Sequence, residues 1–336
     1  MQPIFASINK SNQHWNKTLS NPSFNNCIKS IECSGREEHI KNQIKQFPNV
    51  KIFFPFSTRA FDRINFYTYQ NLFDSFKIKY LVLSHETHCI FNDKLLFYQE
   101  MIKRNLQDFI PKLYDFPNSP QAEQKQSQKI MQSINMQRCK SSQYILNKCP
   151  LSIKSTKIDA IEDKEEYFHF EPIKYPCILK KRKSVWGIGT FIIDNESDFK
   201  SVDLIKSNIC EDYLLCEPIL GNTEYGTHVL AANGEILFCR SAQYIFDSDV
   251  YVFGQKKIYD RSSFVSLEEI YPEVFDNIKL IVKTFNCSGF ICIDHKIVEN
   301  KIKIFEINPR IGGSLAKTPE LLKELLIKYI DCVNRL

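Results

Sequence analysis

The chain has 336 residues, of which 43% are hydrophobic and 25% charged, and its formal net charge is +5. This is an ordinary globular composition, and the mild positive charge suits an anionic ligand such as a nucleotide without indicating DNA or RNA. No run approaches the ~20 apolar residues that cross a bilayer, and the N-terminus lacks an apolar run of signal-peptide length. Twelve cysteines with no Cys-x-x-Cys pair are typical of reduced thiols, so we expect a cytoplasmic protein with no membrane partner.

Glycine is distributed unevenly. Nine of the ten glycines lie at or beyond Gly187, and only Gly35 precedes them. Because glycine permits tight turns and close approach of the backbone to a ligand, we expect the chemistry in the second half of the chain.

The first ninety residues (1–90) predict an N-terminal α/β domain. Residues 51–56 predict a short apolar strand, 71–76 lie in a predicted helix, and 79–84 are an apolar run of buried-strand length. A helical pattern follows at 93–109 and ends before Pro111. Its predicted apolar side carries Leu96, Ile102, Leu106 and Phe109.

Residues 118–166 differ in character. The stretch QAEQKQSQKIMQS (121–133) holds five glutamines in thirteen residues, with no glycine or aromatic residue. This composition predicts a polar insert, which is either a mobile excursion or a solvated helix.

Beyond Tyr175 the pattern is rich in strands. Short apolar runs bounded by polar residues predict strands at 175–180, 213–217, 227–231, 236–244, 290–298 and 302–307. Before the fifth of these, apolar residues recur at helical spacing, and Gly289 ends that segment. The residues of this predicted helix face are Val274, Ile278, Ile281, Val282 and Phe285.

The most informative segment is GFICIDHKIVENKIKIFEINPRIGG (289–313). Two apolar runs flank the polar loop Glu299-Asn300-Lys301, which is a good three-residue hairpin connection. If that loop is symmetric, Asp294 lies directly across from Glu306. Like charges in this position destabilise a sheet unless something positive lies between them. Asn308, two residues beyond Glu306, points to the same face.

An Asp, a Glu and an Asn that converge on one point make a hard set of oxygen donors. Such a set suits Mg²⁺, whose coordination is usually completed by phosphate oxygens. We therefore predict Asp294, Glu306 and Asn308 as metal ligands. A surface hairpin with two solvated carboxylates is the alternative, but it does not explain why both acids lie within apolar runs. Arg310 could reach the same phosphates as a permanently charged donor.

The run FEINPRIGGS (305–314) closely resembles the signature of ATP-grasp enzymes, in which a Glu-x-Asn pair and an upstream acid hold two magnesium ions against ATP. Biotin carboxylase, carbamoyl-phosphate synthetase and the D-alanine–D-alanine ligases share this arrangement. The resemblance extends from Lys94 to Ser314, interrupted by the 118–166 insert. It implies an α/β (α+β) protein with an ATP-grasp fold, in which two α+β subdomains grip ATP.

The same resemblance implies a domain division. The divergent α/β domain at 1–90 precedes an ATP-grasp domain at 91–336. Within the latter, 175–220 corresponds to a small lid subdomain and 221–336 to the metal-binding subdomain. The implied cofactors are ATP and Mg²⁺, for which Mn²⁺ can substitute.

Two lysines resemble the phosphate-binding lysines of the family. Lys94 follows Asn92-Asp93 at the predicted start of a helix, and Lys180 ends the predicted strand YPCILK. Either lysine alone would be read as an ordinary surface lysine. The loop KSVWGIGT, with Gly187 and Gly189, resembles the glycine-rich flap over the phosphates, although it is shorter and poorer in glycine than usual. Backbone N–H groups in such a loop can cradle anions.

The segment LLCEPILGNTEYGTHVLAANGEIL (214–237) is similar to the hinge that binds adenine. The resemblance places Glu217 in this hinge, and main-chain groups of Pro218 and Leu220 against the adenine edge. Glu224, seven residues beyond Glu217, matches the acid that accepts hydrogen bonds from the ribose hydroxyls. Without the neighbouring motifs, a charged strand–turn pair would be the preferred interpretation.

Arg240 follows the Asn233-Gly234 turn on a predicted strand. It is a candidate for holding an acyl phosphate or a substrate carboxylate. A solvent-facing or structural arginine is an equally good interpretation, and the residues themselves do not separate the two.

The resemblance implies an ADP-forming ligase that activates a carboxylate as an acyl phosphate and joins it to an amine or similar nucleophile. Lys180, Arg240 and Arg310 would be its catalytic residues, and small-molecule carboxylates and amines its partners. A small-molecule kinase on the same fold and an inactive nucleotide-binding regulatory protein are the two alternatives. A homodimer is one possible assembly, and we expect no nucleic-acid partner.

Overall fold

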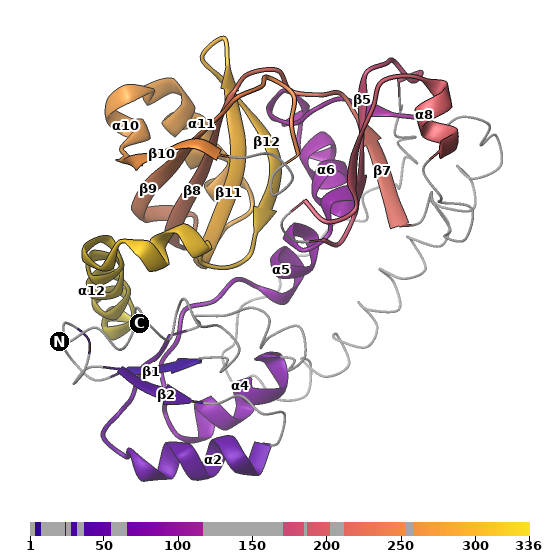
Figure 1. Ribbon diagram of the computed structural model, residues 1–336. Helices are drawn as coiled ribbons and strands as arrows, with labels where there is room; N and C mark the ends of the chain where they lie inside the picture. Colours follow the sequence, from indigo (N-terminus) through magenta and orange to yellow (C-terminus); the bar gives the residue numbers. More distant parts are fainter. Residues whose placement is uncertain are drawn as a thin grey trace, which may run out of the picture. The chain divides into compact units, whose positions relative to one another are not determined.

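The computed structural model shows the chain as two compact units (Figure 1). One unit comprises residues 1–111, 183–188 and 218–336, and the other comprises 112–182 and 189–217. The structure describes residues 4–7, 24, 28–31, 37–54, 66–116, 171–184, 187–201, 212–252 and 258–336. The predicted insert at 118–166 lies outside these residues. Among those described, no helix is long and apolar enough to cross a membrane.

The first unit begins with a small parallel sheet. Its strand order is β2 (Ile28–Ile31), β1 (Ile4–Ser7) and β3 (Phe53–Phe54). Helices α2 (Glu37–Gln46) and α4 (Phe66–Ser75) pack beside it. Ile40 and Ile44, one turn apart on α2, are buried in a cluster that includes Phe53 and Phe73, because one face of the helix is apolar.

Residues 79–84, predicted as a buried strand, do not form one. Only Lys79 makes a β-bridge, to Ile52. Leu81 and Leu83 are buried, but the Leu81 N–H donates to the Tyr329 hydroxyl at 2.9 Å. A side chain from the C-terminal helix therefore takes the place of a neighbouring strand, which an apolar run alone does not reveal.

The helical pattern at 93–109 is divided into two elements. These are α6 (Lys94–Lys103), whose first turn is capped by Asp93, and a short 3₁₀ turn at Gln107–Phe109. Helix α5 (His85–Phe91) precedes them. Asn105 has φ of 58°, a left-handed conformation that ends the α-helical path. The predicted apolar side was largely wrong, because Leu96, Ile102 and Phe109 are only half-buried and Leu106 alone is buried. The side chains that α6 buries are Lys94, Leu95, Phe97, Tyr98 and Met101.

The centre of the first unit is an antiparallel five-stranded sheet of order β10-β9-β8-β11-β12. Four strands extend the predicted runs and one, β10, was not predicted. Their bounds are β8 (Thr223–Ala232), β9 (Glu235–Phe246), β10 (Ile258–Val265), β11 (Gly289–Val298) and β12 (Lys301–Asn308). The short α10 (Leu267–Ile270) precedes the predicted helix, which is observed as α11 (Pro272–Thr284).

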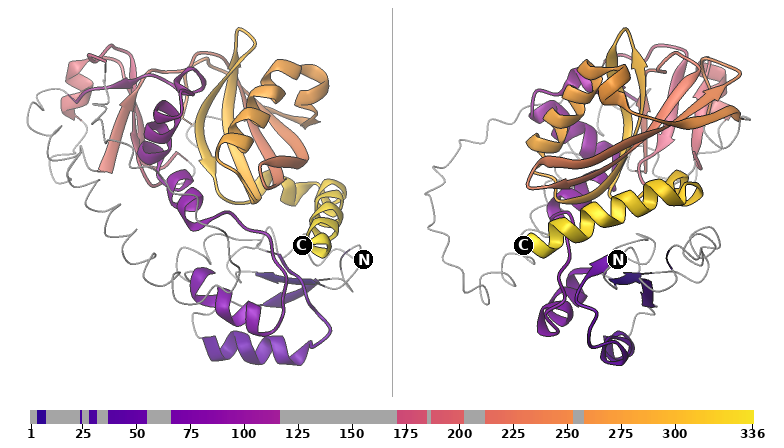
Figure 2. Two further views of the ribbon diagram at one scale, coloured as in Figure 1. Left: turned by 180° about the vertical axis from the view of Figure 1, so that it is seen from behind. Right: turned by 90° about the vertical axis from the view of Figure 1, so that its left-hand side faces the viewer.

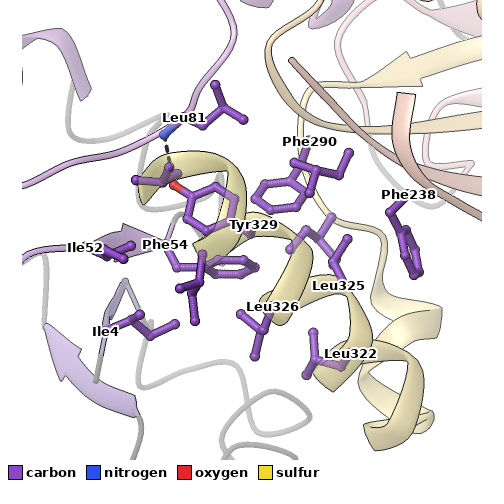
Figure 3. Packing of buried hydrophobic residues seen from close by; sticks show 14 of the residues in the cluster. Ile4, Ile52, Phe54, Leu81, Phe238, Phe290, Leu322, Leu325, Leu326 and Tyr329 are labelled. Atoms are coloured by element: carbon purple, nitrogen blue, oxygen red, sulfur yellow. Dashed lines mark hydrogen bonds between the residues drawn. The ribbon is translucent and has the colours of Figure 1, made fainter. Parts of the chain in front are cut away.

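The C-terminal helix α12 (Pro319–Arg335) joins the two sheets of this unit through one apolar core (Figures 2 and 3). The Tyr329 ring lies 4.8 Å from Phe54 and 5.2 Å from Phe290, measured between ring centroids. Its hydroxyl also donates to the Phe53 carbonyl at 2.7 Å. Leu322, Leu325 and Leu326 are buried in the same core, so α12 ties the small parallel sheet to the large one.

The described residues of the second unit form a four-stranded antiparallel sheet and one short helix. The strand order is β4 (Leu113–Tyr114), β7 (Tyr213–Cys216), β5 (Cys177–Lys181) and β6 (Thr190–Ile193). Helix α8 (Glu196–Ser201) follows β6. One face of this sheet is apolar, and it buries Tyr114, Cys177, Leu179, Ile193 and Leu215.

A candidate active site on one face of the large sheet

The hairpin of β11 and β12 places Asp294 opposite Glu306, as predicted, but by a different path. The turn has two residues, Glu299 and Asn300, with φ of 51° and 61°, as a type I′ turn requires. An irregularity between Asp294 and His295 then inserts Phe305 as an extra residue in β12. The shorter turn shifts the register by one residue and the extra residue shifts it back, so Asp294 still pairs with Glu306.

The strand register brings the polar candidates onto one face of the sheet. In one cross-strand row, Arg240, His228, Cys292 and Asn308 are successive neighbours on β9, β8, β11 and β12. In the next row, the neighbours are Ala242, Gly226, Asp294 and Glu306. Side chains two apart on a strand share a face, so Glu224 and Lys296 belong to it as well.

Five side chains on this face form a connected polar cluster. The Asn308 Nδ2 donates to Asp294 Oδ2 at 2.9 Å and to Glu306 Oε1 at 3.0 Å. Lys94, the first residue of α6, places its Nζ 2.7 Å from Glu306 Oε2. The Arg310 guanidinium donates to Asn308 Oδ1 at 3.2 Å. Two carboxylates, two cations and one amide are thus linked by one chain of direct contacts.

The environment of this cluster disfavours the ionised form of Asp294. Burial raises the pKa of Asp294 well above its ordinary value, and the Glu306 and Glu224 carboxylates raise it further. Arg310 acts in the opposite direction. A buried carboxylate beside two others is stabilised by an added cation, because the cation compensates for both lost hydration and repulsion.

The donor chemistry of the cluster fits a hard divalent cation. Asp294 and Glu306 supply carboxylate oxygens, and Asn308 can present its amide oxygen after rotation about its terminal side-chain bond. In the described part of the chain, no group of three or more His, Cys, Asp or Glu side chains is arranged to hold a metal. Two carboxylates and an amide are nevertheless sufficient for Mg²⁺, which usually takes further oxygens from phosphate and water.

A buried histidine supports the loop that follows β12. His228 is 2% exposed, and burial, with Arg310 nearby, lowers its pKa to about 3. Its Nδ1 accepts from the Gly312 N–H at 3.3 Å, so Nε2 carries the proton and donates to Ser314 Oγ at 2.6 Å. A Cβ on Gly312 would lie 2.4 Å from His228 Cε1 and 2.7 Å from Cys292 Sγ. This close approach explains why glycine is required at 312.

Lys296 is a second buried polar residue of the same face. Its side chain is on the strand β11, and Nζ donates to the Ile219 carbonyl at 2.8 Å and to the Asp249 carbonyl at 3.0 Å. Nζ also lies 4.2 Å from the centre of the Tyr251 ring. Burial lowers the pKa of Lys296 to about 8, whereas Glu224 and Asp249 raise it.

Comparison with known proteins assigns the family. The family profile of the ATP-grasp domain matches residues 143–314, which is just over half of the 336 residues. The chain belongs to the ATP-grasp family. Its fold is the ATP-grasp fold, and the mixed helices and antiparallel sheets described above agree with it.

Individual relatives are distant. A D-alanine–D-alanine ligase of Campylobacter lari is 25% identical over an alignment of 176 residues that covers 47% of this chain and 51% of the relative. The chain thus spans about half the length of this curated relative. A D-alanine–D-alanine ligase structure from Bacillus anthracis aligns with a TM-score of 0.55, at 14% identity, over 100% of this chain and 98% of that one. An N5-carboxyaminoimidazole synthetase from Staphylococcus aureus, solved with ADP, gives 0.51 at 12% identity, over 94% and 72%.

The other residues predicted from the ATP-grasp resemblance lie in both units. Lys180, Gly189 and Glu217 belong to the second unit, whereas Gly187, Pro218, Leu220 and Glu224 belong to the first. Gly187 and Gly189 have φ of 69° and 73°, which favours glycine at both positions. Glu224 is buried at 9% exposure.

Three predicted residues have protein partners. Lys180 is buried beside the Cys216 thiol and counteracts the effect of burial, which raises the pKa of that thiol. Glu217 Oε1 accepts from the Lys112 N–H at 3.0 Å. Arg240 NH2 lies 3.8 Å from Glu324 Oε1 of α12, and NH1 donates to the Cys239 carbonyl at 2.8 Å. The structural interpretation of Arg240 therefore has contacts that support it.

Sequence reasoning missed three polar residues of the site. His228, Lys296 and Ser314 were not singled out, although the alternation of a strand places His228 on the face of Glu224 and Lys296 on that of Asp294. Applying this period of two outward from the predicted ligands would have found the first two. Ser314 follows the strand, and its contact with His228 depends on the path of the loop.

Proposed function

We propose that the chain is an ADP-forming ligase that activates a small-molecule carboxylate and joins it to an amine or similar nucleophile. The observation that carries the proposal is the contact of Lys94 and Arg310 with the Asp294–Glu306–Asn308 set in a chain of the ATP-grasp family. The ligase names of its relatives support the same activity.

The proposed reaction has two steps. An oxygen of the substrate carboxylate bonds to the γ-phosphorus of ATP while the bond to the β-phosphate oxygen breaks, which releases ADP and gives an acyl phosphate. The nucleophile then bonds to the acyl carbon while the bond to phosphate breaks, and the nucleophile loses a proton. No covalent protein nucleophile is needed, because charge stabilisation and positioning supply the catalysis.

The residues have distinct proposed roles. Asp294, Glu306 and Asn308 would hold Mg²⁺ or Mn²⁺, which, when bound, screens the charge of the phosphates and polarises them. Lys94, Lys180 and Arg310 would neutralise charge on the transferring phosphoryl group, and backbone N–H groups at Gly187 and Gly189 would cover it. A cation at each point of developing charge favours the transition state over the bound substrate.

The remaining nucleotide contacts are proposed by the same reasoning. Glu224 would accept hydrogen bonds from the ribose hydroxyls. Main-chain groups at Pro218 and Leu220, next to Glu217, would contact the adenine edge, and Arg240 would hold a substrate carboxylate if its contact with Glu324 opens.

The test is a screen for ADP and phosphate release over a panel of acids and amines, with the acid labelled by ¹⁸O in its carboxylate. An acyl-phosphate ligase transfers one labelled oxygen to the released phosphate and forms an amide. A kinase gives a phosphorylated product without free phosphate, and a nucleotide-binding regulatory protein gives no turnover. Glu306→Gln is the negative control, because it removes a proposed metal ligand while keeping the shape of the side chain.

A further inference from the structure

The buried Nζ atom of Lys296 connects three segments of the first unit. Its residue is 4% exposed, and Nζ contacts the carbonyls of Ile219 and Asp249 and the face of the Tyr251 ring. Lys296 itself lies on β11, whereas Ile219 precedes β8 and Asp249 follows β9. The ammonium group therefore fixes two irregular segments to a strand that carries a proposed metal ligand.

The segment that Lys296 holds is the proposed adenine hinge. Ile219 lies between Pro218 and Leu220, directly after the point at which the chain passes from the second unit to the first. Because Lys296 already donates to the Ile219 carbonyl, we expect the adenine contacts from the main-chain groups on either side of it. The Leu220 side chain is 61% exposed and offers apolar surface to a flat base.

The chemistry of Lys296 indicates more than packing. Burial of an ammonium group is costly unless hydrogen bonds and nearby charges compensate, and even a buried ion pair can often be replaced by apolar side chains of similar volume at no loss of stability. Here the compensation comes from two main-chain carbonyls, the Tyr251 ring and the Glu224 carboxylate. Each of these groups belongs to the hinge, to the loop beyond β9 or to the proposed ribose contact.

We propose that Lys296 is a positioning residue of the nucleotide site, which holds residues 218–220 in the conformation that binds the adenosine part of ATP. This inference rests on the proposed function. It assigns to Lys296 an effect on the nucleoside end of ATP and none on the phosphates, which other residues bind.

The experiment compares the wild-type chain with Lys296→Met by calorimetry, using Mg·ATP, Mg·ADP and Mg·tripolyphosphate as ligands. Loss of the charged hydrogen bonds should weaken ATP and ADP binding by about tenfold. Tripolyphosphate lacks the nucleoside, so its affinity should stay within about twofold in the variant. Lys303→Met is the matched control, because Lys303 lies directly across from Lys296 on β12 and donates to the Ile110 carbonyl instead. It should bind all three ligands like the wild type.

Two results would overturn the inference. One is wild-type affinity of Lys296→Met for ATP, and the other is an equal loss of affinity for tripolyphosphate. If Lys296→Met does not fold, Lys296→Gln keeps an uncharged NH₂ donor group and should show an intermediate loss of affinity for ATP and ADP, with tripolyphosphate binding unchanged. Failure of both variants to fold would make Lys296 a residue of the fold and would also contradict the proposal. Absence of ATP binding in the wild-type chain, in contrast, would contradict the proposed function itself.

Discussion

The Lys94 ammonium lies 2.7 Å from the Glu306 carboxylate, so a predicted phosphate-binding cation directly contacts a predicted metal ligand. Lys94 Nζ also contacts Oγ of Ser184, three residues before Gly187, at 3.2 Å. The positive group that the facing carboxylates of Asp294 and Glu306 require is thus supplied by the start of α6. One lysine connects three motifs that are far apart in the sequence.

This contact makes Glu306→Gln a test of both stability and catalysis. The substitution removes the negative charge that faces Lys94, whose side chain is only 11% exposed. Since Asn308 already bridges the two acids, relief of their repulsion should be the smaller effect. We expect the unfolding free energy, measured without nucleotide, to fall by about 1 kcal/mol. Turnover should fall at least about a hundredfold, because phosphoryl charge is left uncompensated.

Thermal melts and an ADP-release assay measure these two effects. Glu100→Gln is the control, because Glu100 pairs with Arg104 on α6, outside the polar cluster. It should change turnover little. Retained turnover in Glu306→Gln, with stability reduced, would show that Glu306 is structural and would contradict its role as a metal ligand.

Removal of divalent metal by chelation tests whether Asp294, Glu306 and Asn308 bind a metal ion. If Asp294, Glu306 and Asn308 hold Mg²⁺ between them and the phosphates, EDTA should weaken ATP binding by at least about tenfold. Mn²⁺ should restore it, since it accepts the same oxygen donors. The measurement is a titration with ATP in Mg²⁺, Mn²⁺ and EDTA. Equal ATP affinity in all three solutions would contradict the metal site.

The sequence was sufficient to predict the parts of the site that depend on local periodicity. Alternation along a strand and a polar turn predicted the pair Asp294–Glu306 and the shared face of Asn308, and the register confirms both. The two-residue turn and the extra residue Phe305 were not predictable, because two opposite shifts of register leave the same pair.

Tertiary contacts account for the rest. The Lys94–Glu306 pair depends on where α6 packs against β12, and the Tyr98 hydroxyl that donates to the Phe305 carbonyl is part of that packing. Similarly, the Tyr329 hydroxyl accepts from the Leu81 N–H and donates to the Phe53 carbonyl, which no pattern within 79–84 reveals. Neither contact leaves a periodic pattern in the residues that make it.

Buried His295 should make stability depend on pH. Its ring is fully buried on the opposite face of the sheet, stacked on Tyr225, with Nε2 2.8 Å from Thr227 Oγ1. Burial lowers its pKa from 6.5 to about 3. The unfolded chain therefore takes up a proton that the folded chain does not. Stability from this group is complete above pH 6.5 and falls by ~1.4 kcal/mol per pH unit as pH decreases towards 3.

Urea titrations between pH 4 and pH 7 measure this dependence. His295→Gln removes the titrating ring but keeps a hydrogen-bonding side chain opposite Thr227, so the slope below pH 6.5 should become shallower by ~1.4 kcal/mol per unit. His228 contributes a separate share that remains in the variant. An unchanged slope would show that the His295 ring is hydrated in the folded protein.

Gly312 and Gly313 are neighbours in the loop after β12, and substitution of each by alanine tests how tightly that loop is packed. A methyl group at 312 would meet His228 Cε1 at 2.4 Å and Cys292 Sγ at 2.7 Å, both from buried side chains that have little space to move. A methyl group at 313 would meet nothing within 4 Å. Neither residue has the left-handed φ that disfavours alanine, so the two substitutions differ mainly in steric contact.

Gly312→Ala should therefore displace the loop that carries Arg310 and Ser314, whereas Gly313→Ala should not. Overpacking of this kind usually costs about 1–3 kcal/mol, which a thermal melt detects. Because Arg310 is proposed to stabilise the transferring phosphoryl group, ADP release should also fall about tenfold or more in Gly312→Ala. Gly313→Ala should match the wild type in both measurements. Equal behaviour of the two variants would mean that the loop yields without moving Arg310, and it would remove the steric argument for its position.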